Sequence, residues 1–203
     1  MYIIDAFWSI IPGNETTAYA ALGELAARVE REEPDTWMYL LHTPNLDRGV
    51  NTFPMPGPEQ VAFVRNTSDA LSTVANGLSW RKGDNIVTFS REFPSNIYPW
   101  LRVRDNFGVE VRMCEERNGR IDFTELSTLI DQNTRIVAIS HVQYASGFRM
   151  DLERLGRLAR QHDALFVVDA IQALGVVPTD VEAEFIDVAA GAGHKWLLSR
   201  LML

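Results

Sequence analysis

The chain has 203 residues, 46% of them hydrophobic and 23% charged, which is typical of a folded globular protein and argues against disorder. The formal net charge of −8 and pI near 5.0 argue against a broad surface for nucleic acid or anionic lipid, because such surfaces need clustered cations. No run of eighteen apolar residues occurs, and residues 1–5 lack the basic stretch that precedes a signal-peptide core. We therefore expect a cytoplasmic protein that acts on small molecules, with no nucleic-acid or membrane partner.

The first predicted element is an amphipathic helix over residues 15–33, which Pro34 ends. Residues 45–58 are rich in Pro, Gly and Asn and predict a surface loop, with Phe53 and Met55 turned inward. We expect residues 1–59 to form an N-terminal helix and loop segment, and residues 60–203 to form the main domain.

From residue 61 onward, short β-branched runs alternate with helical stretches, which is typical of βαβ units around a mostly parallel sheet. The predicted strands are residues 61–65, 86–90, 109–114, 135–140, 165–169 and 186–190. The predicted helices between them are residues 68–78, 96–106, 123–130 and 152–162. The expected fold class is therefore α/β. The single cysteine, Cys114, ends one of these strands, and we interpret it as a buried structural residue and not as a nucleophile.

Polar clusters follow five of the six predicted strands. They begin at Asn66, Glu92, His141, Asp169 and Gly191. Ligands of open α/β sheets bind outside the carboxyl ends of the strands, and these ends meet at one edge of a parallel sheet. We therefore expect the five clusters to form one site.

The last cluster, Gly-Ala-Gly-His-Lys-Trp, contains Lys195, one of only two lysines in the chain. Arginine supplies the other 17 basic side chains, and Lys82 lies in a polar turn typical of solvated surface. A lysine amine can lose its proton and attack a carbonyl to form a Schiff base, whereas arginine stays protonated. Lys195 is therefore the strongest candidate for a catalytic residue.

Three other positions each allow a functional and a structural interpretation. Asp169 ends an apolar strand, so it either caps a following helix or places a partly buried carboxylate that needs a cationic partner. Thr67 and Ser68 either cap a helix or help its free N–H groups to bind phosphate. His194 is either a solvated loop residue or a donor to an anion beside Lys195.

Together these residues resemble the signature of the class V aminotransferases, pyridoxal-phosphate enzymes of fold type I that include cysteine desulfurases, kynureninase and isopenicillin N epimerase-like proteins. The motifs lie in the family's order and cover about residues 60 to 198. They are residues 65–76, Phe93-Pro-Ser-Asn96, His141-Val142 with Ser146-Gly147, Asp169-x-x-Gln172 with Gly175 and Asp180, and residues 193–197. The resemblance implies a three-layer α/β/α large domain with a mostly parallel central sheet, pyridoxal 5'-phosphate as cofactor, an amino-acid substrate and a homodimer.

The resemblance also implies a role for each site residue, and no metal site. Lys195 would bind the cofactor as a Schiff base and carry the proton at the substrate's Cα. Asp169 would pair with the pyridinium nitrogen, Gln172 would hydrogen-bond the phenolic oxygen, and Phe93 would stack on the ring. The phosphate group would lie among Thr67, Ser68 and His194.

The sequence departs from the family pattern at several positions. Gln143 and Tyr144 replace the Ser-Asn of desulfurases, and with Asn96 they are predicted to line the substrate pocket. Ala192 stands where many relatives have a hydroxyl that contacts phosphate. Desulfurases usually have a histidine where Phe93 stands, so we expect an aminotransferase, with lyase, epimerase or desulfurase chemistry as alternatives.

The family continues beyond the lysine segment with a Gly/Pro-rich turn, another strand and a small C-terminal domain, whereas this sequence ends at Leu203. We therefore expect a large domain that is incomplete at its C-terminus. Two alternatives to an active enzyme remain. One is a truncated, non-catalytic fragment, and the other is a nucleotide-binding α/β domain, although the sequence has neither a Gly-x-Gly-x-x-Gly nor a P-loop run.

Overall fold

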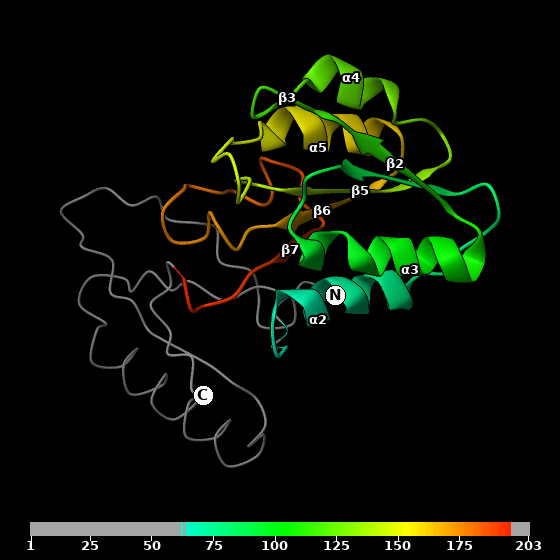
Figure 1. Cartoon of the computed structure of the whole chain (residues 1–203), viewed down its shortest axis with the longest axis horizontal. Coiled ribbons are helices and arrows are strands. Elements are labelled where there is room, and N and C mark those ends of the chain that lie inside the picture. Colours follow the sequence, from blue (N-terminus) through cyan, green and yellow to red (C-terminus); the bar gives the residue numbers. More distant parts are fainter. Residues whose placement is uncertain (1–61, 63, 196–203) are drawn as a thin grey trace, which may run out of the picture.

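The computed structural model describes residue 62 and residues 64–195. This part of the chain contains a five-stranded parallel sheet in the order β2-β1-β5-β6-β7, with helices on both faces (Figure 1). The sheet strands are β1 (Asn85–Phe89), β2 (Glu110–Cys114), β5 (Thr134–Ser140), β6 (Leu165–Asp169) and β7 (Val188–Ala190). The α-helices are α2 (Thr67–Gly77), α3 (Tyr98–Phe107), α4 (Phe123–Thr128) and α5 (Leu152–Gln161). The predicted three-layer α/β/α fold is confirmed.

Two apolar layers hold the sheet between its helices. Within β1, Val87 and Phe89 belong to the layer that also contains Leu155 of α5, whereas Ile86 belongs to the layer that contains Leu71 of α2 and Trp100 of α3. Alternate residues of one strand thus pack on opposite faces. Because both faces are covered, the inner strands are mostly apolar, whereas the edge strand β2 carries the charged side chains Glu110 and Arg112.

The five sheet strands after the first were predicted to within two residues at each end. The first predicted strand, residues 61–65, was wrong in its described part, because residues 62, 64 and 65 belong to no strand. The main chain and side chain of Arg65 instead bond to Asp69, and Asn66 caps α2, so the chain here already turns into the helix. Residues 61 and 63 lie outside the described part.

The helix predicted over residues 96–106 is two elements. A 3-10 helix, η3 (Pro94–Asn96), comes first, and Ile97 with φ −121° and ψ −54° separates it from α3. The predicted helix at residues 15–33 and the loop at 45–58, with Phe53 and Met55, lie outside the described residues, so the proposed boundary at residue 59 stays a prediction.

A small antiparallel hairpin was not predicted. Strands β3 (Glu116–Arg117) and β4 (Arg120–Ile121) pair through a two-residue turn in which Asn118 and Gly119 both have positive φ, 54° and 75°. Asn-Gly is the strongest short signal for such a turn, because both residues tolerate the left-handed conformation. The signal was present in the sequence.

The sheet order places a topological switch between β1 and β5. From β1 the chain goes through α3 to β2 on one side, whereas from β5 it goes through α5 to β6 on the other side. The loops that leave the carboxyl ends of β1 and β5 therefore diverge, and ligands of such sheets bind in the opening between them. Within the described residues, no helix is long and apolar enough to cross a membrane.

Candidate active site

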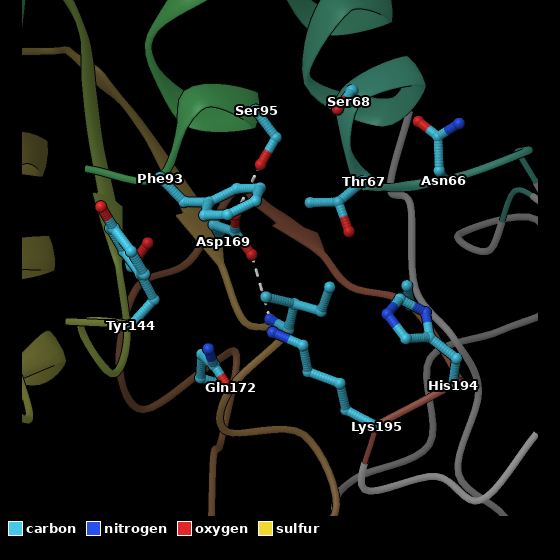
Figure 2. Close-up of a pocket in the computed structure, with 13 residues that line it drawn as sticks. Asn66, Thr67, Ser68, Phe93, Ser95, Tyr144, Asp169, Gln172, His194 and Lys195 are labelled. Atoms are coloured by element: carbon cyan, nitrogen blue, oxygen red, sulfur yellow. Dashed lines mark hydrogen bonds between the residues drawn. The ribbon is translucent and has the colours of Figure 1, made fainter. Parts of the chain in front are cut away.

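A pocket of about 190 Å³ opens at the carboxyl ends of the strands (Figure 2). It brings together all seven residues predicted to bind the cofactor, which are Thr67, Ser68, Phe93, Asp169, Gln172, His194 and Lys195. They come from the start of α2 and from the segments after β1, β6 and β7. The expectation that the polar clusters share one edge of the sheet is therefore confirmed.

Asp169 is the most buried charged group that faces this pocket, at 1% exposure. Its Oδ1 accepts the Ile171 N–H at 3.0 Å, and the Ser95 hydroxyl lies 3.5 Å from Oδ2. The residues that follow form turns and no α-helix, so the helix-cap interpretation of Asp169 is wrong. The pKa of Asp169 is raised to about 7, chiefly by burial and also by the charge of Glu92, while the Ile171 N–H and the charge of Lys195 act to lower it. A cation bound against Asp169 would offset this cost of burial.

Lys195 lies at the end of the described chain, after β7. Figure 2 shows its side chain reaching into the pocket toward Asp169 and Gln172, while His194 lies on the same side as Thr67. The pocket therefore holds an amine and a carboxylate at one end and a group of polar side chains at the other. Ala192 also lines the pocket, so position 192 offers no hydroxyl.

The polar end of the pocket is built on the start of α2. Asn66 is the helix cap, since its Oδ1 accepts the Asp69 N–H at 2.9 Å, and the prediction of a cap at Thr67 or Ser68 is wrong. Thr67 is only 4% exposed, and its hydroxyl has no hydrogen-bond partner in the described structure. An unpaired buried hydroxyl at the positive end of an eleven-residue helix favours an anion as its missing partner.

An aromatic pair forms another wall. Phe93 and Tyr144 are 47% and 50% exposed, and their rings meet edge to face with centroids 5.2 Å apart and planes at 80°. In Figure 2 the Phe93 ring lies above Asp169. A planar ligand ring could therefore contact Phe93 while its edge meets the carboxylate.

Two of the three predicted substrate contacts do not line this pocket. Asn96 is fully buried and accepts a hydrogen bond from the Trp100 indole at 3.1 Å. Gln143 is 2% exposed, and its Nε2 donates to Glu92 Oε1 at 2.7 Å. Both side chains lie beneath the surface and away from the pocket lining, so the geometry does not support direct contact with a substrate. Tyr144, the third, does line the pocket.

Three residues in or behind the pocket had no predicted role, namely Ser95, Ser140 and Glu92. Ser95 and Ser140 line the pocket, and Glu92 lies buried behind it, hydrogen-bonded to Ser140. The available signal was position, because Glu92 and Ser95 follow β1 in the same polar cluster as Phe93. Nothing in the local sequence indicates that a glutamate after a strand turns inward.

Other reactive groups lie away from this chemistry. Cys114 is buried, and desolvation raises its pKa to about 11, which agrees with a structural role. His141 is buried with Nδ1 3.2 Å from the Thr179 hydroxyl, and burial lowers its pKa to about 4. Within residues 64–195 no group of three or more His, Cys, Asp or Glu side chains is placed to hold a metal ion.

The arrangement suits one kind of ligand. Lys195 can attack a carbonyl carbon, Asp169 favours a protonated ring nitrogen, Phe93 offers an aromatic face, and the start of α2 favours an anion. A planar cationic ring that carries a carbonyl group and a phosphate satisfies all four. This fold and site define a pyridoxal-phosphate type of pocket.

Comparison with known proteins agrees with this class. The family model "Aminotransferase class-V" matches residues 50–199, and the chain belongs to that family. A probable cysteine desulfurase of Methanothermobacter thermautotrophicus is 40% identical over 141 residues, which cover 69% of this chain and 35% of that protein. The matched part thus spans about a third of this relative's length.

Solved structures give the same relationship. A cysteine desulfurase from Thermococcus onnurineus superposes with a TM-score of 0.62 and 35% identity, over 64% of this chain and 33% of that one. The cystine C–S lyase C-DES, solved with cysteine persulfide, gives a TM-score of 0.60 and 26% identity, over 64% and 36% of the two chains. A variant of C-DES has been solved with glycine covalently linked to its pyridoxal-phosphate cofactor.

These relationships indicate pyridoxal phosphate as the cofactor of the chain, as the resemblance predicted. The residues present fit that group. The buried Asp169 carboxylate needs a cation, and the unpaired Thr67 hydroxyl needs a partner at the positive end of α2. The preference for an aminotransferase over a desulfurase finds no support among these relatives, whose names refer to sulfur chemistry.

The buried Asp169 carboxylate predicts a pH-dependent stability in the absence of cofactor. Its pKa in the folded chain, about 7, exceeds its ordinary 3.8, so the folded state binds this proton more tightly than the unfolded state. The resulting stabilisation is complete below pH 3.8 and is lost as the pH rises through 7. Asp169→Asn stays neutral and can still accept the Ile171 N–H. We expect it to exceed the wild type in free energy of unfolding by roughly 2 to 4 kcal/mol at pH 8.

Urea unfolding of both proteins without cofactor at pH 4, 6 and 8 measures this difference. The gap should close toward pH 4. A gap that stays constant with pH would show that Asp169 keeps an ordinary pKa in the folded protein.

Proposed function

We propose that this chain is the cofactor-binding part of a pyridoxal-phosphate enzyme that acts on an amino acid at its Cα. The observation that carries the proposal is the pocket itself, in which Lys195, the buried Asp169 and the unpaired Thr67 hydroxyl converge. Lys195 is proposed as the residue that binds the cofactor covalently. Asp169, Gln172 and Phe93 are proposed to hold its ring, and Thr67, Ser68 and His194 its phosphate.

The bound cofactor supplies a ring that withdraws electrons from the substrate's Cα. The chain's own contribution is largely electrostatic. A positive ring nitrogen against Asp169 lowers the pKa of this carboxyl from about 7, so that the carboxylate stays ionised. Because Asp169 is almost fully buried, little water screens this pair. The carboxylate therefore keeps the ring nitrogen protonated.

Lys195 is also proposed to move the proton at Cα. Its amine is the only one among the described residues that line the pocket, and Figure 2 shows it directed inward. In the aromatic wall, Phe93 has no titratable group and cannot share this task. His141 is buried and does not line the pocket, so it is not a candidate.

The reaction class rests on the relatives. The matching proteins named cysteine desulfurase and cystine C–S lyase support cleavage of a carbon–sulfur bond in a cysteine-type substrate. Transamination is the second candidate, and Phe93 favours it, since desulfurases usually have a histidine at that position. We further propose, from the family resemblance, a cytoplasmic homodimer without a nucleic-acid or membrane partner.

Thr67 provides a test of the phosphate site. Thr67→Val keeps the shape and removes the hydroxyl, so pyridoxal phosphate should bind about tenfold more weakly because one hydrogen bond to an anion is lost. Pyridoxal, which lacks the phosphate, should bind to the variant and the wild type equally. Thr88→Val is the matched control, because the Thr88 hydroxyl is also buried and unpaired but does not line the pocket.

Titration of each protein with the two ligands, followed by absorbance, measures these affinities. If Thr67→Val weakened pyridoxal as much as pyridoxal phosphate, the threonine would not contact the phosphate.

Lys195 provides the central test. When pyridoxal phosphate is added to the pure protein, we expect the visible absorbance band of a lysine-bound pyridoxal group, and borohydride should fix the cofactor to the peptide that contains Lys195. Lys195→Ala should lose both signals. Lys82→Ala removes the only other lysine, which is exposed, and should keep both.

A band that persists in Lys195→Ala would refute the covalent role of Lys195. With the cofactor bound, sulfide release from cysteine supports carbon–sulfur cleavage, whereas transfer of the amino group to a 2-oxo acid supports the second candidate.

A further inference from the structure

Glu92 lies at the topological switch of the sheet. It follows β1, and its side chain crosses to the end of β5, from which the chain departs in the opposite direction. Only 5% of Glu92 is exposed, and it does not line the pocket. A charged side chain rarely takes such a position without a defined set of partners.

Those partners are three hydrogen-bond donors from β5 and the loop after it. Glu92 Oε1 accepts the Ser140 N–H at 2.7 Å and the Gln143 Nε2–H at 2.7 Å. Oε2 accepts a short hydrogen bond from the Ser140 hydroxyl. No salt bridge to Glu92 occurs among the described residues. The carboxyl is therefore held by neutral donors alone, and each of them ties the two diverging segments together.

The same two segments carry the aromatic wall of the pocket. Phe93 follows Glu92, and Tyr144 follows Gln143, so a buried polar pair lies directly behind an exposed ring pair. The Gln143 main chain also closes its own loop, with its N–H donating to Phe148 O and its C=O accepting from Gly147 N, both at 2.9 Å. Hydrogen bonds to a buried carboxyl are stronger than the edge contact of two half-exposed rings. The buried pair is thus the firmer link between the two loops.

We infer that Glu92 is a positioning residue, whose hydrogen bonds to Ser140 and Gln143 set Phe93 and Tyr144 against the pocket. It acts on Phe93 and Tyr144 through shape and not through charge, because an amide can replace the carboxyl in these contacts. An amide oxygen accepts the two N–H groups as the carboxyl oxygen does, and the Ser140 hydroxyl can accept from an amide N–H as well as donate. In Glu92→Gln, Oε1 keeps the two N–H groups and Nε2 donates to the Ser140 hydroxyl. The inference rests on the proposed function in one respect, since it treats this pocket as the cofactor site.

The test compares Glu92→Gln, Glu92→Ala and Gln143→Leu in the full chain. Glu92→Ala and Gln143→Leu should weaken pyridoxal phosphate about tenfold and reduce the visible circular dichroism of the bound cofactor, because the Phe93 wall is displaced. Glu92→Gln should stay within about threefold of the wild type. Gln143→Leu leaves the Ser140 bonds in place, so it serves where Glu92→Ala fails to fold.

Asn85→Ala is the matched control. Asn85 is buried at the opposite end of the same strand pair, where it donates to Asp131 at 2.9 Å and accepts from Thr134 at 2.7 Å. This variant should lower the melting temperature without changing cofactor affinity or circular dichroism. A purely structural role of Glu92 would give the Asn85→Ala pattern and overturn the inference. An equal loss in Glu92→Gln and Glu92→Ala would also overturn it, because charge would then be the important property.

Hydrogen exchange without cofactor separates this inference from the proposed function. Residues 141–149 should exchange faster in Glu92→Ala and Gln143→Leu than in the wild type and Glu92→Gln. The Ser140 amide should exchange faster in Glu92→Ala alone, because Gln143→Leu keeps its bond to Glu92. If the wild type failed to bind pyridoxal phosphate, the proposed function would fail, while this exchange pattern would still support the link between the loops. Unchanged exchange in Gln143→Leu would refute the link.

Discussion

The site depends on one buried charge, the carboxylate of Asp169. Its main chain pairs with Ser140 of β5 on one side and Ala190 of β7 on the other. This pairing fixes the backbone at Asp169, and the side chain is buried from solvent. Its protein partners are one backbone N–H at 3.0 Å and a hydroxyl at 3.5 Å, which is a small set for a carboxylate. A cation in the pocket would stabilise the ionised form, which is the basis for proposing a protonated ring nitrogen there, with Lys195 nearby.

Asp169 and Glu92 are both buried carboxyls, but they differ in their hydrogen-bond partners and in their access to the pocket. Both are buried at the carboxyl ends of adjacent parts of the sheet, and burial raises the pKa of each. Glu92 is surrounded by three donors and closed off from the pocket, so its bonding is complete without a ligand. Asp169 is open to the pocket and poorly satisfied. Glu92 is therefore suited to hold the loops behind the pocket in place, and Asp169 is suited to bind a cationic ligand group.

Most of the candidate site was predictable, because most of its residues lie at or just after the ends of strands, and a parallel sheet brings these ends together. Thr67 and Ser68 are the exception, since they lie at the start of α2 and follow no described strand. Asp169 and Lys195 needed only the strand pattern and the rarity of lysine. Gln143 was misplaced for the opposite reason. Its burial depends on Glu92, 51 residues earlier in the chain, and no local pattern shows which of two neighbouring polar residues turns inward. The structure assigns Gln143 to the interior and Tyr144 to the pocket.

Membership of the family does not by itself determine the reaction. Under the proposed function, the carboxylate, the amine and the start of α2 would hold the cofactor whichever reaction it carries out at Cα. The aromatic wall, which comes from the loops after β1 and β5, is then a candidate for the part that meets the substrate. In this chain it is Phe93 against Tyr144, two half-exposed rings of which only the tyrosine can exchange a proton. If Lys195 moves the proton at Cα, as proposed, the choice between carbon–sulfur cleavage and transamination would depend on whether it acts alone or together with Tyr144.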